Sequence, residues 1–268
     1  MPRVNVRGCE LYYEDSAARG QAVVFVHGVW MSGRFFQPQF LALGEQFRIV
    51  VPDLRGHGRS AQVPVGHTVP TYARDLRGLL ETLKLDDVVL VGWSMGCMVI
   101  WDYIQQFGTQ GIRGTVLVDQ SPCDFKSDDW PFGAFDLPQL TAIMDLVQTN
   151  RDAFVHDFIS LMGAEEPNDE QRQWFFDEIT RPSEAIASAI LFDQTMRDYR
   201  PMLEHINVPT LVGCGRKDKL VPTAASEHVA RQIPGARHVI FDNSGHCPFL
   251  DEPERVNEEL ARFIQSLQ

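Results

Sequence analysis

One five-residue segment, Gly92-Trp93-Ser94-Met95-Gly96, constrains the fold more than any other part of this 268-residue chain. The apolar run Val88-Val89-Leu90-Val91 comes directly before it, and a helix-like apolar stretch, residues 97–101, follows it. A G-x-S-x-G segment in this context is typical of a strand that turns sharply into a helix. The turn brings the residues two before and two after its apex close together, so only glycine-sized groups fit at positions 92 and 96.

Ser94, at the apex of the predicted turn, has the position of a nucleophile. The turn pushes its hydroxyl out above the sheet, and the backbone N–H of Met95 at the helix start is free to face developing negative charge. A second donor is expected in the loop after the apolar run 22–26, where the small Gly28 lets the N–H of Val29 approach the same oxygen. Met95 and Val29 are therefore the predicted oxyanion-hole donors.

Three further residues lie next to these groups in the sequence. Trp30 follows Val29 and Trp93 precedes Ser94, so an apolar substrate pocket is one interpretation of the two tryptophans and simple packing is the other. Cys97 lies near the start of the predicted helix, where a thiol can be reactive. We favour the interpretation that this thiol packs as a small apolar group.

A serine nucleophile needs a base, and an acid must hold that base in one tautomer. His246 lies in a loop marked by glycine and proline just after the last predicted strand, where it can reach back over the sheet. Asp218 follows another predicted strand, at the same end of the sheet as Ser94. The chain order Ser94, Asp218, His246 matches a known arrangement of serine triads. Asp119, at the end of the preceding strand, is the rival for the acid.

Strands and helices alternate on both sides of a central segment. Apolar runs typical of buried strands occupy residues 22–26, 47–51, 88–91, 115–118, 210–212 and 238–241. The alternation predicts an α/β fold in which a mostly parallel sheet carries helices on both faces. Between the two halves only helical patterning remains, so we expect a core of residues 1–120 and 206–268 and an inserted helical cap, or lid, of residues 121–205.

Charge is concentrated in that predicted cap. The formal net charge of the chain is −12, and residues 121–205 hold 17 Asp and Glu against 6 Lys and Arg. Nucleic acids and anionic membranes are bound through clustered Lys and Arg, so neither is an expected partner.

No membrane or secretion signal is visible in the sequence. The chain has no apolar run of about 18 residues, and residues 1–7 lack an apolar signal segment, so a cytoplasmic protein is expected. The 5 cysteines are odd in number and form no C-x-x-C pair, which argues against a disulfide framework or a zinc cluster. No feature indicates an oligomeric state.

Several segments of the chain resemble those of the α/β-hydrolase fold superfamily, in the branch that contains bacterial esterases, lactonases and cofactor-free haloperoxidases. The resemblance covers roughly residues 22–120 and 207–267, and it is carried by His27-Gly28, Asp53-Leu54-Arg55-Gly56-His57-Gly58-Arg59-Ser60, the turn at 92–96, Gly215-Arg216-Lys217-Asp218 and Gly245-His246-Cys247-Pro248-Phe249. It implies that residues 53–60 form a structural loop. Cys97 departs from the pattern, because many relatives have a second glycine there. The serine at 94 argues against the relatives that use aspartate as nucleophile, the dehalogenases and epoxide hydrolases.

The residues and the resemblance together predict a serine hydrolase that transfers an acyl group to water, with no metal or organic cofactor. The expected substrate is a small ester or lactone, and N-acyl homoserine lactones are one candidate class. A cofactor-free haloperoxidase or perhydrolase would use the same triad with peroxide as the acceptor. A non-enzymatic small-molecule receptor, in which movement of the lid recruits a partner, is the second alternative.

Overall fold

The computed structural model describes residues 2–267 and contains one eight-stranded sheet in the order β1-β2-β4-β3-β5-β6-β7-β8. Strands β3 to β8 are parallel to one another, and β2 is antiparallel to both β1 and β4. The strands are β1 (Arg3–Val6), β2 (Cys9–Asp15), β3 (Ala22–Val26), β4 (Arg48–Pro52), β5 (Val88–Trp93), β6 (Ile112–Val118), β7 (Thr210–Gly215) and β8 (Arg237–Phe241). The predicted α/β fold is confirmed.

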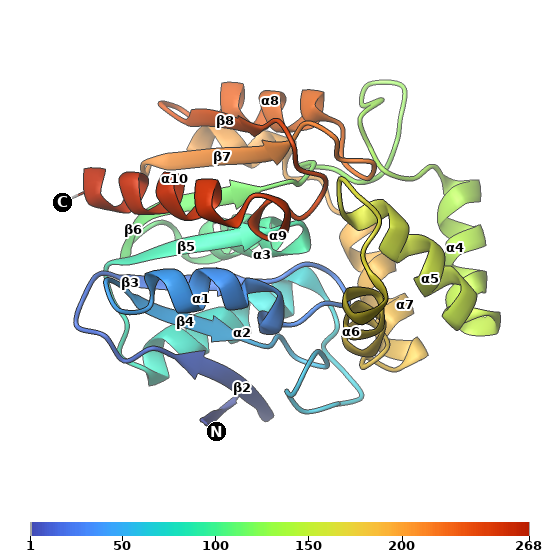
Figure 1. Cartoon of the computed structure of the whole chain (residues 1–268), viewed down its shortest axis with the longest axis horizontal. Helices are drawn as coiled ribbons and strands as arrows, with labels where there is room; N and C mark the ends of the chain where they lie inside the picture. The colour runs from blue at the N-terminus through green and yellow to red at the C-terminus, as the bar shows by residue number, and fades with distance from the viewer. Residues whose placement is uncertain (1, 268) are drawn as a thin grey trace.

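Burial explains why the central strands read as continuous apolar runs. All residues of β5 and of β7 are buried, because helices cover both faces of the sheet. Helices α1 and α10 lie on one face, and α2, α3 and α8 lie on the other (Figure 1). These helices are α1 (Gln37–Leu43), α2 (Val69–Thr82), α3 (Met95–Phe107), α8 (Thr223–Gln232) and α10 (Pro253–Ser266). Sequence periodicity predicted α2, α3 and α10 but did not predict α1 or α8.

Four helices between β6 and β7 lie beyond the ends of the strands, and we call them the cap helices. Figure 1 shows them at the side of the molecule toward which the arrows of the parallel strands point. Side-chain capping boxes at Asp136 and Asn168 fix the starts of two of them. The cap helices are α4 (Leu137–Thr149), α5 (Arg151–Met162), α6 (Asp169–Ile179) and α7 (Glu184–Thr195). They place a helical layer over the edge of the sheet where ligands bind in such folds.

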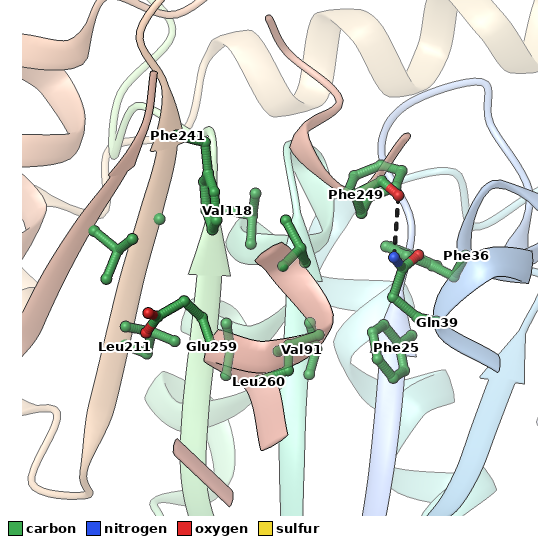
Figure 2. Close-up of a pocket in the computed structure, with 14 residues that line it drawn as sticks. Phe25, Phe36, Gln39, Val91, Val118, Leu211, Phe241, Phe249, Glu259 and Leu260 are labelled. Atoms are coloured by element: carbon green, nitrogen blue, oxygen red, sulfur yellow. Dashed lines mark hydrogen bonds between the residues drawn. The ribbon is translucent and has the colours of Figure 1, made fainter. Parts of the chain in front are cut away.

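The layer between the sheet and helices α1 and α10 contains a small space of about 20 Å³ (Figure 2). Phe25, Val91 and Leu260 are among its mainly apolar lining residues. Gln39 crosses the layer, and its side-chain amide donates a hydrogen bond to the carbonyl oxygen of Phe249 at 3.0 Å (Figure 2). A space of this size holds about one water molecule, so it belongs to core packing and not to a ligand site.

Two features of the rest of the chain complete the fold. Short 3-10 helices, η1 (Gly33–Phe36) and η2 (Arg200–His205), and the one-turn helix α9 (Pro248–Asp251) connect the larger elements. Within residues 2–267, no helix has the length and apolar character needed to cross a membrane.

Candidate active site

The turn at Ser94 joins β5 to α3 in a strained backbone conformation. Ser94 has φ 53° and ψ −128°, a region that residues with a side chain rarely adopt. A Cβ atom on Gly92 would lie 2.7 Å from backbone atoms of Gly96, and one on Gly96 would lie 2.0 Å from the carbonyl oxygen of Val26. The two glycines are therefore required by close approach to each other and to the neighbouring strand β3.

A buried histidine fixes the loop that follows β3. Nε2 of His27 accepts a hydrogen bond from the N–H of Leu54 at 2.9 Å, so the proton is on Nδ1, which donates to the carbonyl oxygen of Gly28 at 2.8 Å. Burial lowers the pKa of His27, which keeps the ring neutral in this structural role. The N–H groups of Val29, in this loop, and of Met95, the first residue of α3, make no hydrogen bond within the described part of the chain. Both predicted oxyanion donors are therefore free.

The predicted base and acid are in direct contact. Nδ1 of His246 donates to Oδ2 of Asp218 at 2.8 Å, and the exposed fractions of the two side chains are 5% and 0%. Oδ1 of Asp218 accepts the backbone N–H groups of Leu220 and Val221 at 2.7 and 3.1 Å. These three donors satisfy a buried carboxylate and hold it in one orientation, which in turn fixes the imidazole ring.

Trp93 holds the histidine loop and does not line the substrate cavity. Its ring is fully buried between Phe35, Phe36 and Phe249, and its indole N–H donates to the carbonyl oxygen of His246 at 2.7 Å. This corrects the expectation of a pocket role, because successive side chains of a strand point to opposite faces, and Trp93 ends β5 inside the core. Of the two interpretations of this tryptophan, packing is the one that the structure bears out.

Ser94 and His246 line one cavity of about 250 Å³ beneath the cap helices. Trp30 is part of its wall and packs edge-on against Phe154 and Phe158 of α5. No hydrogen bond joins the Ser94 hydroxyl to His246 in residues 2–267, a looseness that is common in sites without substrate. Asp157 and Lys219 are charged members of the wall. Its apolar part comes largely from the cap and the segments beside it: Ala134, Phe135, Ile143, Leu161, Leu191, Leu220 and Val221.

Asp119, the rival for the acid, is a second buried carboxyl beside Asp218. Its Oδ1 accepts the N–H of Gly215 at 2.9 Å, and its Oδ2 is buried with no hydrogen-bond partner among the described residues. Burial and the negative charge of Asp218 raise the pKa of Asp119 well above its usual range. The hydrogen bond with His246 is made by Asp218, and the raised pKa of Asp119 favours its protonated form.

Sequence reasoning missed a polar cluster in the cavity wall. Oδ1 and Oδ2 of Asp124 accept the side-chain amides of Gln120 and Gln194 at 2.7 and 3.0 Å, and all three residues line the cavity. Burial raises the pKa of Asp124 to about 7, and the two amides oppose that shift. The position of Gln120 and Asp124 directly after β6, at the carboxyl edge of the sheet, was the available signal. Gln194 gave none, because it lies within a cap helix.

The cysteines do not line the cavity. All 5 are free and buried, and Cys97 directs its thiol toward the carbonyl oxygen of Gly92 at 3.2 Å. Burial raises the pKa of the Cys97 thiol, so it is not a reactive thiolate. Among residues 2–267, no group of three or more His, Cys, Asp or Glu side chains is placed to hold a metal ion.

Comparison with known proteins places this site in a family. Residues 23–259 match the sequence model described as "Alpha/beta hydrolase family". The chain belongs to this family. The α/β-hydrolase is 31% identical to a non-heme chloroperoxidase of Kitasatospora aureofaciens, with 98% of this chain and 99% of the relative covered.

Two further comparisons extend the family assignment to esterases. A bifunctional esterase/perhydrolase of Acinetobacter calcoaceticus is 28% identical to this α/β-hydrolase, with 97% of each chain covered. The solved structure of an esterase from Exiguobacterium antarcticum superimposes with a TM-score of 0.92 at 29% identity, and 97% of each chain is covered. The recognised resemblance to this branch of the family is confirmed.

Proposed function

We propose that this α/β-hydrolase cleaves carboxylic esters or lactones through an acyl-enzyme on Ser94. The observation that carries the proposal is the 2.8 Å hydrogen bond from His246 to Asp218, on a histidine that shares one cavity with Ser94. Because the Asp218 carboxylate accepts a hydrogen bond from Nδ1–H, the proton of the neutral ring stays on Nδ1, and Nε2 is free to accept the proton of the serine hydroxyl. The esterases among its relatives support this chemistry.

The reaction proceeds in two acyl-transfer steps. Nε2 of His246 takes the hydroxyl proton as Oγ of Ser94 attacks the ester carbonyl carbon, and the N–H groups of Val29 and Met95 stabilise the oxyanion. Collapse of this intermediate breaks the bond to the alcohol oxygen, which leaves with the proton from His246. Water then gives a proton to His246, attacks the acyl carbon and releases the acid, and Ser94 recovers its proton. For a lactone the leaving hydroxyl stays attached to the acyl group.

Substitution of the proposed nucleophile tests the enzyme class. Ser94→Ala is expected to lower kcat/KM for a 4-nitrophenyl ester by about 10⁴-fold or more, because no other group in the cavity can form the acyl-enzyme. Stopped-flow and steady-state rates measure this loss. Near-normal hydrolysis by Ser94→Ala would exclude the mechanism, and very slow turnover by the unaltered protein would favour the small-molecule receptor.

Substitutions of Asp218 and Asp119, the two buried candidates, test which aspartate is the acid of the triad. Asp218→Asn is expected to lower kcat by about 10³-fold or more, because asparagine can direct its amide at Nδ1 and select the wrong tautomer of His246. Asp119→Asn is expected to retain most of the activity, because Asp119 makes its hydrogen bond with Gly215 and not with His246 and its raised pKa favours the neutral form. The reverse order of the two losses would assign the acid to Asp119.

Peroxide is the competing acceptor. The names of the chloroperoxidase and of the bifunctional esterase/perhydrolase favour a perhydrolase as the second candidate, since an acyl-enzyme of the same structure gives a peracid when hydrogen peroxide replaces water. Product analysis with one ester in buffer with and without hydrogen peroxide separates the two functions. Dominant acid formation supports the hydrolase, and dominant peracid formation supports the perhydrolase.

A further inference from the structure

The carboxylate of Asp124 lies in the cavity wall, and no positively charged side chain among residues 2–267 is hydrogen-bonded to it. Its two oxygens accept N–H groups from neutral amides, Gln120 at 2.7 Å and Gln194 at 3.0 Å. Asp124 is 4% exposed. A carboxylate held this way costs free energy relative to one in water, and an apolar side chain would line an ester pocket without that cost.

Gln194 presents a second acceptor at the same place. It is 4% exposed, and its Nε2 faces Asp124 because a carboxylate can only accept from it. Its Oε1 is left buried with no hydrogen-bond partner among residues 2–267. Buried acceptors normally have a donor, so this wall of the cavity lacks one.

The cluster is close to the reacting groups. Asp124 and Gln194 line the same cavity as Ser94 and His246. Asp124 is close enough to His246 that a positive charge on the imidazole ring lowers the pKa of the Asp124 carboxyl. The rest of the wall is mainly apolar, and its charged members are Asp157 and Lys219, of which Lys219 donates to the carbonyl oxygen of Ser160. A ligand in the cavity therefore meets apolar groups over most of its surface, and Asp124 and Gln194 place two buried acceptor side chains side by side in one part of the wall.

We infer that the substrate carries a hydrogen-bond donor, a hydroxyl or an amide N–H, which Asp124 and Gln194 bind and by which they select it over plain aliphatic esters. This inference rests on the proposed ester or lactone hydrolysis and names the substrate class for it. Asp124 and Gln194 are specificity-determining residues, and the reaction itself takes place at Ser94.

Matched esters test the inference on the full chain. The probes are ethyl esters that carry a hydroxyl in either the acyl chain or the alcohol part, each paired with its methyl ether and with the unsubstituted ester. For at least one position of the hydroxyl, kcat/KM is expected to exceed that of the methyl ether by about tenfold or more, because a site built to bind a donor rejects the analogue that lacks it.

Variants separate recognition from a structural role. Gln194→Met and Asp124→Asn are expected to reduce that preference to about twofold or less, whereas Asp157→Asn, which removes the other carboxylate of the cavity wall, changes the rates of both esters equally. Gln194→Met keeps the test informative if Asp124→Asn does not fold. A purely structural cluster would lower the melting temperature of the variants without changing the ratio of the two rates.

The outcomes distinguish this inference from the proposed function. Equal rates for all paired esters, or a preference unchanged in Gln194→Met, would overturn the selection by a donor and leave the esterase function intact. Failure of the unaltered protein to hydrolyse any of these esters or the corresponding lactones would overturn the proposed function itself.

Discussion

Ser94 occupies a backbone conformation that costs free energy, on the order of 1–3 kcal/mol for a residue with a side chain. The strain is imposed by neighbours that cannot move apart, since Gly92 and Gly96 are already in contact with backbone atoms. It keeps Ser94 in the cavity wall while the N–H of Met95 makes no hydrogen bond within the described residues. The protein thus sacrifices stability at this residue for the placement of a reactive group.

Two substitutions that both remove the hydroxyl measure this strain. Ser94→Gly is expected to be more stable to urea than Ser94→Ala by about 1 kcal/mol, because glycine adopts φ 53° without a steric penalty. Equilibrium unfolding of the two variants gives the difference. Equal stabilities would mean that the turn relaxes in the alanine variant and stores no strain.

Asp119 makes stability depend on pH. An unfolded aspartate binds its proton only below about pH 4, whereas burial and Asp218 raise the folded pKa of Asp119. The folded chain therefore binds more protons above that pH, and stability from this group falls as pH rises toward the folded pKa. The free energy of unfolding is expected to decrease more between pH 5 and 8 in the unaltered protein than in Asp119→Asn.

Urea titrations at both pH values check this expectation. Asp124 and Asp251, whose pKa values are also raised by burial, are present in both proteins. The difference between the two proteins in the slope of the unfolding free energy against pH is therefore due to Asp119. Identical slopes would show that Asp119 is ionised in the folded protein at neutral pH.

At the scale of elements, hydrogen bonds connect the cap region to the loops that contain Val29 and His246. The indole N–H of Trp30 donates to the carbonyl oxygen of Ala187 in α7 at 3.0 Å, one residue after the free N–H of Val29. Oδ2 of Asp251 accepts the N–H groups of both Ala164, between α5 and α6, and Gly245, beside the catalytic histidine, at 3.0 and 2.7 Å. We therefore expect motion of the cap to be transmitted to the loop that contains Val29 and to the loop that contains His246.

Removal of the hydrogen bond between Trp30 and Ala187 tests the connection between the cap and the loop that contains Val29. Trp30→Phe is expected to increase amide hydrogen exchange in α5 and α7 and to lower kcat by about tenfold, because the oxyanion loop loses its anchor. Trp101→Phe is the matched control, since the indole nitrogen of Trp101 is buried without a hydrogen-bond partner in the described structure. Unchanged exchange in α5 and α7 would show that the cap is held independently of Trp30.

At the scale of the whole molecule, the net charge of −12 acts on the approach of substrates. Most of the excess lies in residues 121–205, the stretch that contains the cap helices. The field of such a surface disfavours anionic ligands and favours cationic ones at low ionic strength.

Salt dependence of the rates reveals this field. An ester with a terminal carboxylate is expected to have a lower kcat/KM than its uncharged methyl ester in about 10 mM salt, and the gap is expected to narrow at about 300 mM as screening shortens the range of the field. A trimethylammonium ester is the control of opposite charge, for which added salt lowers the rate. A gap independent of salt would locate the discrimination in the cavity wall alone.

The sequence by itself determined the architecture, and it predicted the candidate site residues that local patterns encode. Buried parallel strands are continuous apolar runs, and the glycines around Ser94 are required by the turn itself. Both features can therefore be predicted from the sequence. The positions of Val29, Met95 and His246 follow from where their loops leave the sheet.

Only the tertiary structure decided between groups that share the same local signals. Asp119 and Asp218 both follow strands, and the contact with His246 depends on how two loops pack. Trp30 and Trp93 both flank the site, yet one lines the cavity and the other supports the histidine loop. Gln194 meets Asp124 across 70 positions of the chain. Contacts of this length arise from packing of the cap on the sheet, which no local pattern specifies.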